Sequence, residues 1–357
     1  MALYLCVDCG GSKTAAAIAN ESGEIIGRAF GGPSNFAYLG VDAFSSSVAT
    51  AVGEALKSCI SPPSQEPVSL PPTSVTFAAA WFGISGVDSP AAVAAITPVI
   101  SKLLGIPAGP RLIVANDTHL LAAPVRLHPE VSCAVAVIGG TGSISVSFKE
   151  SNGVLEELGR IGGWGWILGD EGGGFHVGRE AIRQLLLEHD KASVTGKPPP
   201  HSSLRTRIMN QFSITDFMEI LTLIHLPERT HPAPPDSNVS PHVTIPREKR
   251  LSSLSPMVFE AAFEDKDPLA ISVLRICSDI LADEVSVLLY DEKNPQPRAV
   301  KASESIVSFG GSLVGVAAYR DMILDSLANK GHVFHAVEFV DDAAAVGAVG
   351  LAAAKPV

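Results

Sequence analysis

Three glycine-rich turns, each directly after a short apolar run, are the features of this chain most suited to holding a charged ligand. They span Gly10–Lys13, Gly139–Ser143 and Gly310–Ser312. Glycine lets the backbone approach a ligand closely, and successive exposed N–H groups form anion-binding concavities. The candidate phosphate-binding residues are Gly10, Gly11, Ser12, Lys13, Gly140, Thr141, Gly142 and Gly311. Three such turns in one chain predict a nucleotide whose phosphates are held from several sides.

Asp8 ends the first apolar run and stands just before the first glycine turn. A carboxylate beside phosphate-binding N–H groups is explained by a shared cation, and Mg²⁺ prefers carboxylate, water and phosphate oxygens. We therefore expect Asp8 to position Mg²⁺; the alternative is an aspartate that caps its own turn. Ser12 could hydrogen-bond a phosphate oxygen, and Lys13 could either neutralise phosphate charge or face solvent.

Asn116 and Asp117 follow the apolar run 111–115. Polar residues at the carboxyl end of a strand in an α/β fold line ligand crevices. A carboxylate there can accept the proton of an attacking hydroxyl during phosphoryl transfer. The alternative is an N-cap for a following helix. Since Asn116 can cap while Asp117 reacts, we expect Asp117 to be the catalytic base.

The stretch from Gly162 to Gly174 combines glycines, two of the three tryptophans of the chain, and paired acids. The aromatic face of Trp164 could stack on the C–H surface of a sugar. The carboxylate of Asp170 could accept hydrogen bonds from sugar hydroxyls. The alternative is a plain structural loop, which has little use for this combination, so we expect the stretch to contact a ligand.

Composition limits the classes of protein to consider. A chain of 357 residues exceeds the usual size of a single core and favours two domains. A net charge of −11 argues against nucleic acid as a partner. The sequence has no uninterrupted apolar run of about 18 residues, so no membrane span is expected. The N-terminus is typical of a strand rather than of a signal peptide. The five cysteines are odd in number and favour buried free thiols in a reducing compartment.

Strand-like and helix-like runs alternate along the chain, which predicts an α/β class. Both halves open with strand, glycine-rich turn, strand, turn and strand, and this duplication indicates two related domains facing a cleft. The expected strands are 3–8, 14–20, 25–30, 75–84, 111–115, 134–138, 143–148, 155–159 and 306–309, and the expected helices are 41–58, 91–104, 120–127, 178–190, 267–289, 313–327 and 343–354. The Pro-, His- and Ser-rich segment 225–255 predicts an exposed insertion.

These motifs resemble the N-acetylglucosamine kinases and the wider BadF/BadG/BcrA/BcrD ATPase family, within the sugar kinase, Hsp70 and actin superfamily. The resemblance covers residues 3 to about 354 and weakens at about 190–255. It implies two related ribonuclease H-like domains, with the actin, hexokinase and Hsp70 ATPase fold, facing an interdomain cleft. The implied domains are 1–118 and 119–342, with a Pro/His-rich insertion at about 190–255 and a final helix, about 343–356, that packs back on the first domain.

The resemblance also implies roles for individual residues. The first two glycine turns match the family's phosphate loops, and the segment from Gly310 to Gly315 matches an adenosine-side loop. The implied sugar-binding residues are Asn35, Ser85, Asn116, Asp117, Ser143, Gly163, Trp164, Gly165 and Asp170. The chain departs from the family at Cys9 and Ser12, where Gly and Thr are common, and at Ala37, where human-type kinases have an aromatic residue.

The activity that the resemblance implies is ATP-dependent phosphorylation of the 6-hydroxyl of N-acetylglucosamine or a close amino sugar. Asp117 would be the general base, ATP and Mg²⁺ the cofactors, and the protein a cytoplasmic homodimer. Alternatives are a kinase for another amino sugar such as glucosamine, a non-kinase ATPase resembling the activators of 2-hydroxyacyl-CoA dehydratases, and a sugar-sensing regulator. The activators hold an iron–sulfur cluster with cysteines, and residues 139–174 contain none. The intact Asp117 argues against a regulator without turnover.

Overall fold

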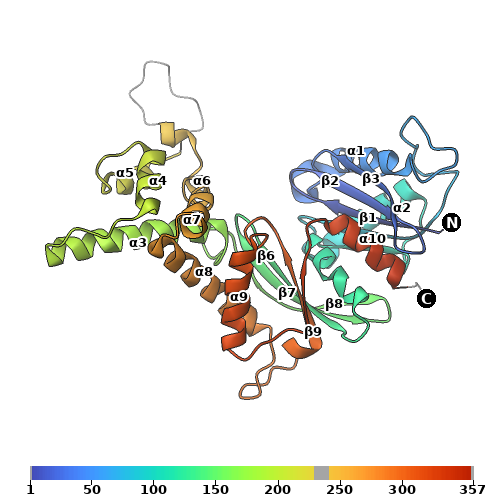
Figure 1. Ribbon diagram of the computed structural model, residues 1–357. Coiled ribbons are helices and arrows are strands. Elements are labelled where there is room, and N and C mark those ends of the chain that lie inside the picture. Colours follow the sequence, from blue (N-terminus) through green and yellow to red (C-terminus); the bar gives the residue numbers. More distant parts are fainter. Residues whose placement is uncertain (1, 229–240, 355–357) are drawn as a thin grey trace.

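The computed structural model describes residues 2–228 and 241–354 and places two five-stranded mixed sheets in two lobes (Figure 1). The first sheet has the strand order β3-β2-β1-β4-β5, and the second has the order β8-β7-β6-β9-β10. In each sheet the first three strands in sequence pair antiparallel and the last two join in parallel. The two sheets therefore repeat one topology, and the predicted α/β class with internal duplication is confirmed.

The first sheet contains β1 (Leu3–Cys9), β2 (Thr14–Ala19), β3 (Ile25–Gly31), β4 (Phe77–Ile84) and β5 (Leu112–Ala115). Side chains of β1 alternate between its two faces, as a strand requires. Leu5 packs with α1 (Phe36–Leu56) and α2 (Pro90–Leu104) on one face. Cys6 packs with α10 (Ala343–Ala353) on the other. Both faces are buried, which explains why these strands are almost entirely apolar.

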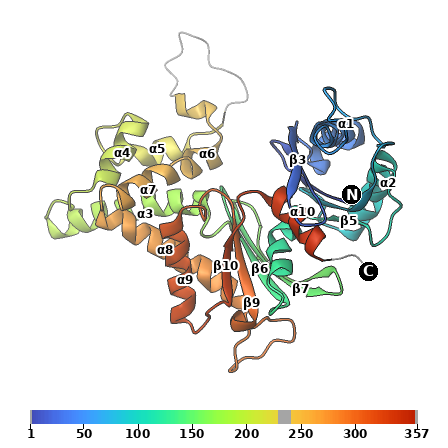
Figure 2. The ribbon, with the colours of Figure 1, turned by 45° about the vertical axis from the view of Figure 1, so that its right-hand side comes forward.

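The second sheet contains β6 (Cys133–Gly139), β7 (Ser143–Ser151), β8 (Val154–Gly162), β9 (Ser305–Gly310) and β10 (Ala336–Phe339). One of its faces packs against α3 (Gly174–Thr195), α8 (Pro268–Val287) and α9 (Ala317–Asn329). Its other face packs against η1 (Asp117–Leu127). In Figure 2, α3, α8 and α9 stand on the side of the second sheet remote from the first lobe.

The 3₁₀ helix η1 joins the two sheets. Its Leu120 and Ala123 pack with the first sheet, whereas Leu121 and Val125 pack with the second. The expected helix 120–127 therefore begins three residues earlier, at Asp117, and Pro124 lies within it. A segment packed on both sides fixes where its first residue, Asp117, points.

The described residues of the expected exposed insertion at 225–255 are largely helical, and they include both exposed and buried side chains. The chain forms α5 (Glu219–His225), η2 (Pro241–Thr244), α6 (Arg247–Ser252) and α7 (Ser255–Phe263) there, next to α4 (Ser203–Phe212). Arg250 is only 1% exposed. Its guanidinium donates to the carbonyl groups of Ile245 and Leu226, which ties α6 to the end of α5. Residues 229–240 of the expected insertion lie outside the described chain.

Several boundaries differ from the expected ones for local reasons. The expected helix 313–327 starts only at Ala317, because the N–H groups of Leu313 and Val314 donate to the Gly139 carbonyl instead. The short strand β10 and the 3₁₀ helix η3 (Ala302–Glu304) were not expected. The expected final helix matches α10, although residues 355–356 lie outside the described chain. Across the described residues, no helix combines the length and apolar character needed to cross a bilayer.

Candidate functional site

The parallel strands of the first sheet end at one edge and bring polar residues together there. Asp8 is the next-to-last residue of β1, Ser85 follows β4, and Asn116 and Asp117 follow β5. In the sheet register Asp8 stands beside Gly83, two residues before Ser85. The sequence-predicted metal, sugar and catalytic residues of the first half therefore share one edge, as the carboxyl ends of parallel strands should.

The negative charge of Asp117 acts on the buried carboxyl group of Asp8. The pKa of Asp8 is raised to about 6, chiefly by burial and also by the negative charges of Asp117 and Asp342, while Lys13 lowers it. Burial also raises the pKa of Asp117, against a backbone hydrogen bond from Thr118 that lowers it. Two partly buried carboxyl groups close together favour either a shared proton or a cation.

Asn116 caps η1, and the Thr118 backbone that it caps also interacts with the Asp117 carboxyl group. The Asn116 Oδ1 atom accepts a hydrogen bond from the Thr118 N–H at 3.0 Å, as an N-cap residue does. The Asn116 Nδ2 atom donates to Asp88 Oδ1 at 2.8 Å. The nearby negative charge of Asp88 raises the pKa of Asp117. Asn116 is therefore the cap of η1, as the sequence allowed, and Asp117 stays the predicted base.

Asn35 and Ser85, which are 50 residues apart in sequence, are in direct contact. The Asn35 Nδ2 atom donates to Ser85 Oγ at 3.0 Å, and Asn35 Oδ1 accepts from the Ala37 N–H at 3.0 Å. A hydrogen bond with the Ser85 side chain lowers the pKa of Asp117. These contacts join the two polar side chains to the candidate base.

The first glycine turn closes on itself beside this edge. The Gly10 N–H donates to the Lys13 carbonyl at 3.0 Å, and the Gly10 carbonyl accepts from the Ser34 N–H at 3.0 Å. The tip, residues 11–13, is exposed. The Lys13 ammonium lies 5.1 Å from the centre of the Phe30 ring, while its charge still lowers the pKa of Asp8. The turn thus presents exposed backbone and one cation next to the carboxyl pair.

The second glycine turn leans against Asp170. The Gly140 N–H donates to the Gly142 carbonyl at 2.9 Å, and the Ser143 N–H donates to Asp170 Oδ1 at 3.4 Å. A Cβ atom at Gly142 would lie 2.7 Å from the Asp170 carboxyl group. Only glycine allows this approach, so the turn and the predicted sugar-binding acid form one unit.

The third glycine turn lies against the second. Gly311 has a φ of 106°, and a Cβ atom there would lie 2.7 Å from the Gly139 carbonyl oxygen. That oxygen accepts a hydrogen bond from the Leu313 N–H at 2.9 Å. The Gly315 N–H donates to the Gly311 carbonyl at 3.0 Å. The two turns, about 170 residues apart in sequence, are therefore fixed to each other through backbone groups.

The segment between β8 and α3 presents its aromatic residues in different ways. Trp164, between Gly163 and Gly165, is 55% exposed. The Trp166 ring instead packs against Phe175, with 5.4 Å between ring centres. Burial raises the pKa of Asp170. Trp164 is thus available to a ligand, and Trp166 anchors the segment to α3.

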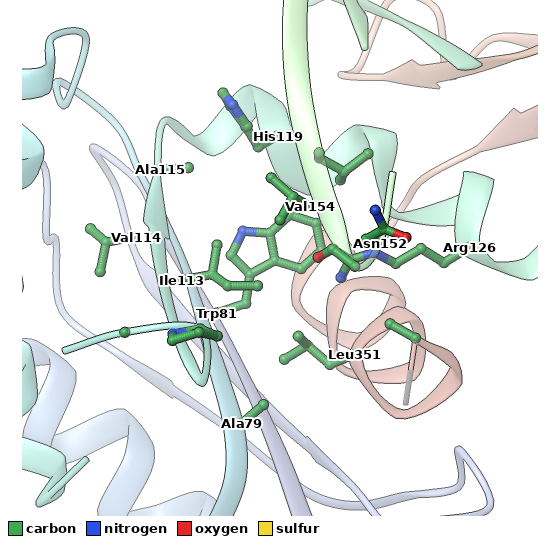
Figure 3. A pocket seen from close by; sticks show the side chains of 15 residues that line it. Ala79, Trp81, Ile113, Val114, Ala115, His119, Arg126, Asn152, Val154 and Leu351 are labelled. Atoms are coloured by element: carbon green, nitrogen blue, oxygen red, sulfur yellow. The ribbon is translucent and has the colours of Figure 1, made fainter. Parts of the chain in front are cut away.

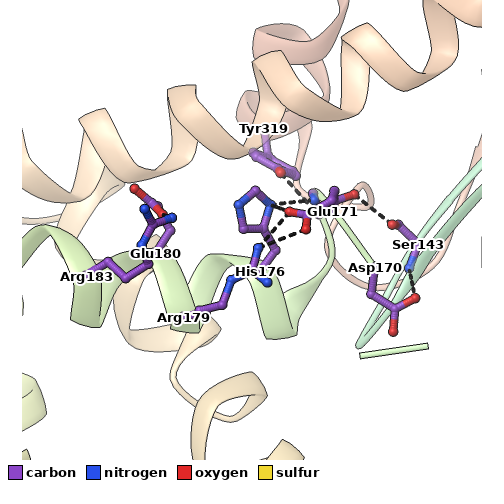
Figure 4. A network of polar contacts seen from close by, with 9 residues as sticks. Ser143, Asp170, Glu171, His176, Arg179, Glu180, Arg183 and Tyr319 are labelled. Atoms are coloured by element: carbon purple, nitrogen blue, oxygen red, sulfur yellow. Dashed lines mark hydrogen bonds and ion pairs between the residues drawn. The ribbon is translucent and has the colours of Figure 1, made fainter. Parts of the chain in front are cut away.

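A polar network that sequence reasoning missed holds Asp170 in place (Figure 4). Both carboxylate oxygens of Glu171 accept hydrogen bonds from Arg179 Nη2, at 2.9 and 2.8 Å. The Glu171 carbonyl accepts from Ser143 Oγ at 2.7 Å. The buried Tyr319 hydroxyl donates to the Gly172 carbonyl at 2.9 Å. Arg179 lies eight residues after Glu171, a spacing that carries no recognisable sequence signal.

His176 completes this network from within α3. Its Nδ1 atom accepts a hydrogen bond from the Gly172 N–H at 2.8 Å and lies 2.9 Å from Glu171 Oε2. Burial lowers the pKa of His176, and the charge of Glu171 opposes that shift. The Glu171 carboxylate also accepts both hydrogen bonds from Arg179.

Two cavities each take in some of the predicted residues. Asn116 lines one of about 350 Å³, together with Asp88, His119, Glu157 and Arg160, and this cavity draws walls from both sheets. Thr141, Gly165, Trp166, Asp170 and Glu248 line another, of about 480 Å³. Glu157, Arg160 and Glu248 were not expected, because they lie outside the glycine motifs. Within the described residues, no cluster of three or more His, Cys, Asp or Glu residues is arranged for a metal.

Comparison with known proteins assigns the family. The model of the BadF/BadG/BcrA/BcrD ATPase family matches residues 5–353. This chain belongs to that family. The predicted resemblance is therefore confirmed over nearly the whole chain, including the described helices at 203–225 and 241–263 where the motifs are weak.

Relatives with assigned activities are similar over much of this member of the family. An N-acetyl-D-glucosamine kinase of Dictyostelium discoideum is 25% identical over 260 residues, which is 73% of this chain and 71% of the relative. An N-acetylmuramic acid/N-acetylglucosamine kinase of Clostridium acetobutylicum is 30% identical over 187 residues, which is 52% of this chain and 54% of the relative. A solved structure of a candidate N-acetylglucosamine kinase from Porphyromonas gingivalis is 21% identical with a TM-score of 0.61, covers all of both chains, and supports the fold.

Proposed function

We propose that this family member is an ATP-dependent kinase that phosphorylates the 6-hydroxyl of N-acetyl-D-glucosamine. The observation that carries the proposal is the pair of carboxyl groups, Asp8 and Asp117, at the strand edge beside the first glycine turn. Phosphoryl transfer needs a proton acceptor for the hydroxyl and a cation for the phosphates, close to each other. The names of the two curated relatives above support the choice of sugar.

Asp117 accepts the proton of the sugar hydroxyl in this proposal. Its raised pKa brings the carboxylate closer to the working pH, which strengthens it as a base. The capping of η1 by Asn116 and the packing of that helix on both sheets hold the Asp117 carboxylate at the edge. A base fixed by its backbone needs no reorganisation when the hydroxyl arrives.

Asp8 fits the role of a Mg²⁺ ligand. Its carboxyl group is partly buried beside a second carboxyl group, and a divalent cation would relieve both the burial and the repulsion that raise its pKa. Mg²⁺ is commonly held by one or two carboxylates together with waters and phosphates, so a larger protein cluster is not required. When bound, Mg²⁺ would neutralise charge on the transferred phosphate.

The nucleotide and sugar contacts follow the glycine turns. Gly10, Gly11, Ser12, Lys13, Gly140, Thr141, Gly142, Gly311 and Gly315 would hold ATP. Asn35, Ser85, Asn116, Ser143, Gly163, Trp164, Gly165 and Asp170 would hold the sugar. The contacts of Asn35 with Ser85 and of Ser143 with Asp170 support grouping these residues. The Asn35–Ser85 pair belongs to the first lobe and the Ser143–Asp170 pair to the second. Closure of the lobes would therefore bring both pairs onto one sugar and exclude water.

The two lobes correspond to proposed domains 1–118 and 119–342, with α10 belonging to the first. The packing of α10 against β1 and β4 supports that division. We further place the protein in the cytoplasm, because its five cysteines are free and suit a reducing compartment. A homodimer is proposed from the family resemblance.

A glucosamine kinase is the second candidate function. A glucosamine kinase of Vibrio cholerae is 26% identical to this chain over 276 residues, which is 77% of this chain and 76% of that relative. Glucosamine lacks the acetyl group of N-acetylglucosamine, and we propose that this group would lie among Asn35, Ser85 and their neighbours.

An ADP-release assay across four sugars tests these proposals. The acceptors are N-acetylglucosamine, glucosamine, N-acetylmannosamine and glucose, each with and without Mg²⁺. We expect the highest kcat/KM for N-acetylglucosamine and no turnover once Mg²⁺ is chelated. Preference for glucosamine would support the second candidate, and ADP release independent of any sugar would overturn both.

A further inference from the structure

A cavity of about 670 Å³ lies where the first sheet, the end of α10 and the β7–β8 turn meet (Figure 3). Its apolar walls include Ala79, Ile113, Val114, Val154, Leu155 and Leu351. None of the residues proposed above for ATP, metal or sugar lines it. This volume falls within the range of small-molecule sites, and its largely apolar walls fit one.

Three buried nitrogen atoms belonging to residues that line this cavity have no hydrogen-bond partner. They are Trp81 Nε1, His119 Nδ1 and Arg126 Nη1. Trp81 is 1% exposed, and the Arg126 side chain is 3% exposed. A buried polar group without a partner costs about 1–3 kcal/mol, so three around one cavity are unusual in a native protein.

Two nitrogens of the Arg126 guanidinium are held by hydrogen bonds, and the third has no hydrogen-bond partner. Its Nε atom donates to Glu150 Oε2 at 3.1 Å, and its Nη2 atom donates to the Gly153 carbonyl at 2.8 Å. Its plane lies over the Trp81 ring, 4.8 Å from the ring centre. Figure 3 shows Arg126 and Asn152 on one side of the Trp81 ring and His119 on the other. The remaining Nη1 is therefore preorganised rather than mobile.

The chemistry of these atoms selects the occupant. Indole and guanidinium nitrogens only donate hydrogen bonds, and a neutral imidazole can offer either role. An occupant must therefore carry acceptor oxygens, and a carboxylate accepts from a guanidinium most strongly. We propose that this cavity is a second binding site, for a small organic carboxylate with an apolar body. This proposal stands independently of the kinase function.

The cavity adjoins the candidate active site through η1. His119 lines both this cavity and the smaller one that contains Asn116, and it lies two residues after Asp117. The walls come from both lobes, with Val154 and Leu155 from the second and Trp81 from the first. An occupant that bridges the lobes changes the free energy of their relative movement.

The indole N–H signals of the full-length ¹⁵N-labelled protein test the site. The three tryptophans provide three signals, and Trp81→Phe identifies that of Trp81. The probe is 4-phenylbutyrate, and its match is 4-phenylbutylamine, which has the same apolar body and a donor head. We expect 4-phenylbutyrate to shift the Trp81 signal saturably, with a Kd of about 1 mM or tighter. The amine should leave that signal in place.

A cavity-filling variant provides the second comparison. Ala354 lines the cavity at the end of α10, so Ala354→Phe should weaken 4-phenylbutyrate binding at least about tenfold. Val194→Phe, at an exposed position at the end of α3, is the matched control and should bind as the wild type does. An unmoved Trp81 signal, equal shifts with carboxylate and amine, or unchanged binding in Ala354→Phe would overturn the proposal. The carboxylate–amine comparison uses wild-type protein and so does not depend on any variant folding.

Discussion

After β1, the first glycine turn stands beside the carboxyl groups of Asp8 and Asp117, whereas the equivalent turn after β6 stands beside Asp170 and Glu171. The first pair lies in a partly buried setting that raises the pKa of both groups. In the second pair burial also raises the pKa of Asp170, whereas the Glu171 carboxylate is held at both oxygens by Arg179. The two halves share a strand order, so the difference lies in the residues placed on it.

We propose that this contrast separates reacting groups from positioning groups. A carboxyl group with a raised pKa is able to take a proton or a cation. A carboxylate whose lone pairs are already occupied by a guanidinium holds the loop that carries it. We therefore expect changes in the first lobe to alter turnover and changes in the second to alter sugar affinity.

The strongest test of the contrast exchanges a carboxylate for an amide in each lobe. Asp117→Asn should lower kcat about a thousandfold, because the proton acceptor is lost while the shape is retained. Its sugar affinity, measured by calorimetry, should change by less than about threefold. Asp170→Asn should instead raise the sugar KM about tenfold, with a smaller loss of kcat.

Two results would contradict this separation. A kcat for Asp117→Asn near that of the wild type would exclude this residue as the base. Equal losses of kcat in both variants would show that the two lobes do not divide their work. Thermal unfolding of each variant provides the control for folding.

The pH dependence of stability tests the setting of Asp8. Its pKa rises from an ordinary 3.8 to about 6, chiefly through burial. The folded state therefore binds more protons than the unfolded state over this range. The contribution of Asp8 to stability is complete below its unfolded pKa and is lost as the pH rises through about 6, a change of at most roughly 3 kcal/mol.

Asp8→Asn is the matched variant for this measurement. In Mg²⁺-free buffer, its free energy of unfolding should fall less between about pH 4 and about pH 7 than that of the wild type. The neighbouring Asp117 titrates in both proteins and supplies the remaining slope. Parallel profiles from urea unfolding would show that the Asp8 carboxyl group is not buried in an unfavourable setting. Addition of Mg²⁺ and ATP should stabilise the wild type more than the variant near neutral pH.

The sheets and the candidate site residues could be predicted because their signals are local. The apolar run at 3–7 predicts a buried strand, and a glycine turn with an aspartate before it predicts a phosphate site. Asn116 and Asp117 follow an apolar run, so a helix cap could be predicted there, and Asp117 stays the predicted base. Even the duplication is visible, because each half repeats the same local order of elements.

The rest depends on contacts between distant segments. The pairing of Arg126 with Trp81 joins residues that no periodicity links, and the Glu171–Arg179 contact crosses a loop into a helix. The helices at 241–263 were obscured by Pro, His and Ser, and the sequence does not reveal that Arg250 finds carbonyl partners in a neighbouring segment. A four-residue edge strand such as β10 is too short for its alternation to stand out.

Two arginines on α3 test whether the hydrogen-bond network of the second lobe affects sugar binding. Arg179 binds Glu171, whereas Arg183, one turn later, binds Glu180 away from the glycine turn (Figure 4). Arg179→Met should raise the sugar KM about tenfold, because Asp170 loses the support of its neighbour. Arg183→Met should leave KM within about twofold, since Gln184 still donates to Glu180. Equal effects in steady-state kinetics would show that Arg179 contributes only to the stability of α3.

The smallest expected effect concerns the exposed cation of the first glycine turn. Lys13 lies over Phe30 and lowers the pKa of Asp8, so its charge reaches the site without a direct ion pair. Lys13→Met should raise the KM for ATP about threefold at low salt and less at high salt, because exposed charges are screened. Lys102→Met, in the last turn of α2, removes the same charge away from the turn and should leave this KM unchanged. If both variants respond alike, the effect comes from net charge, and the first turn holds phosphate through its backbone alone.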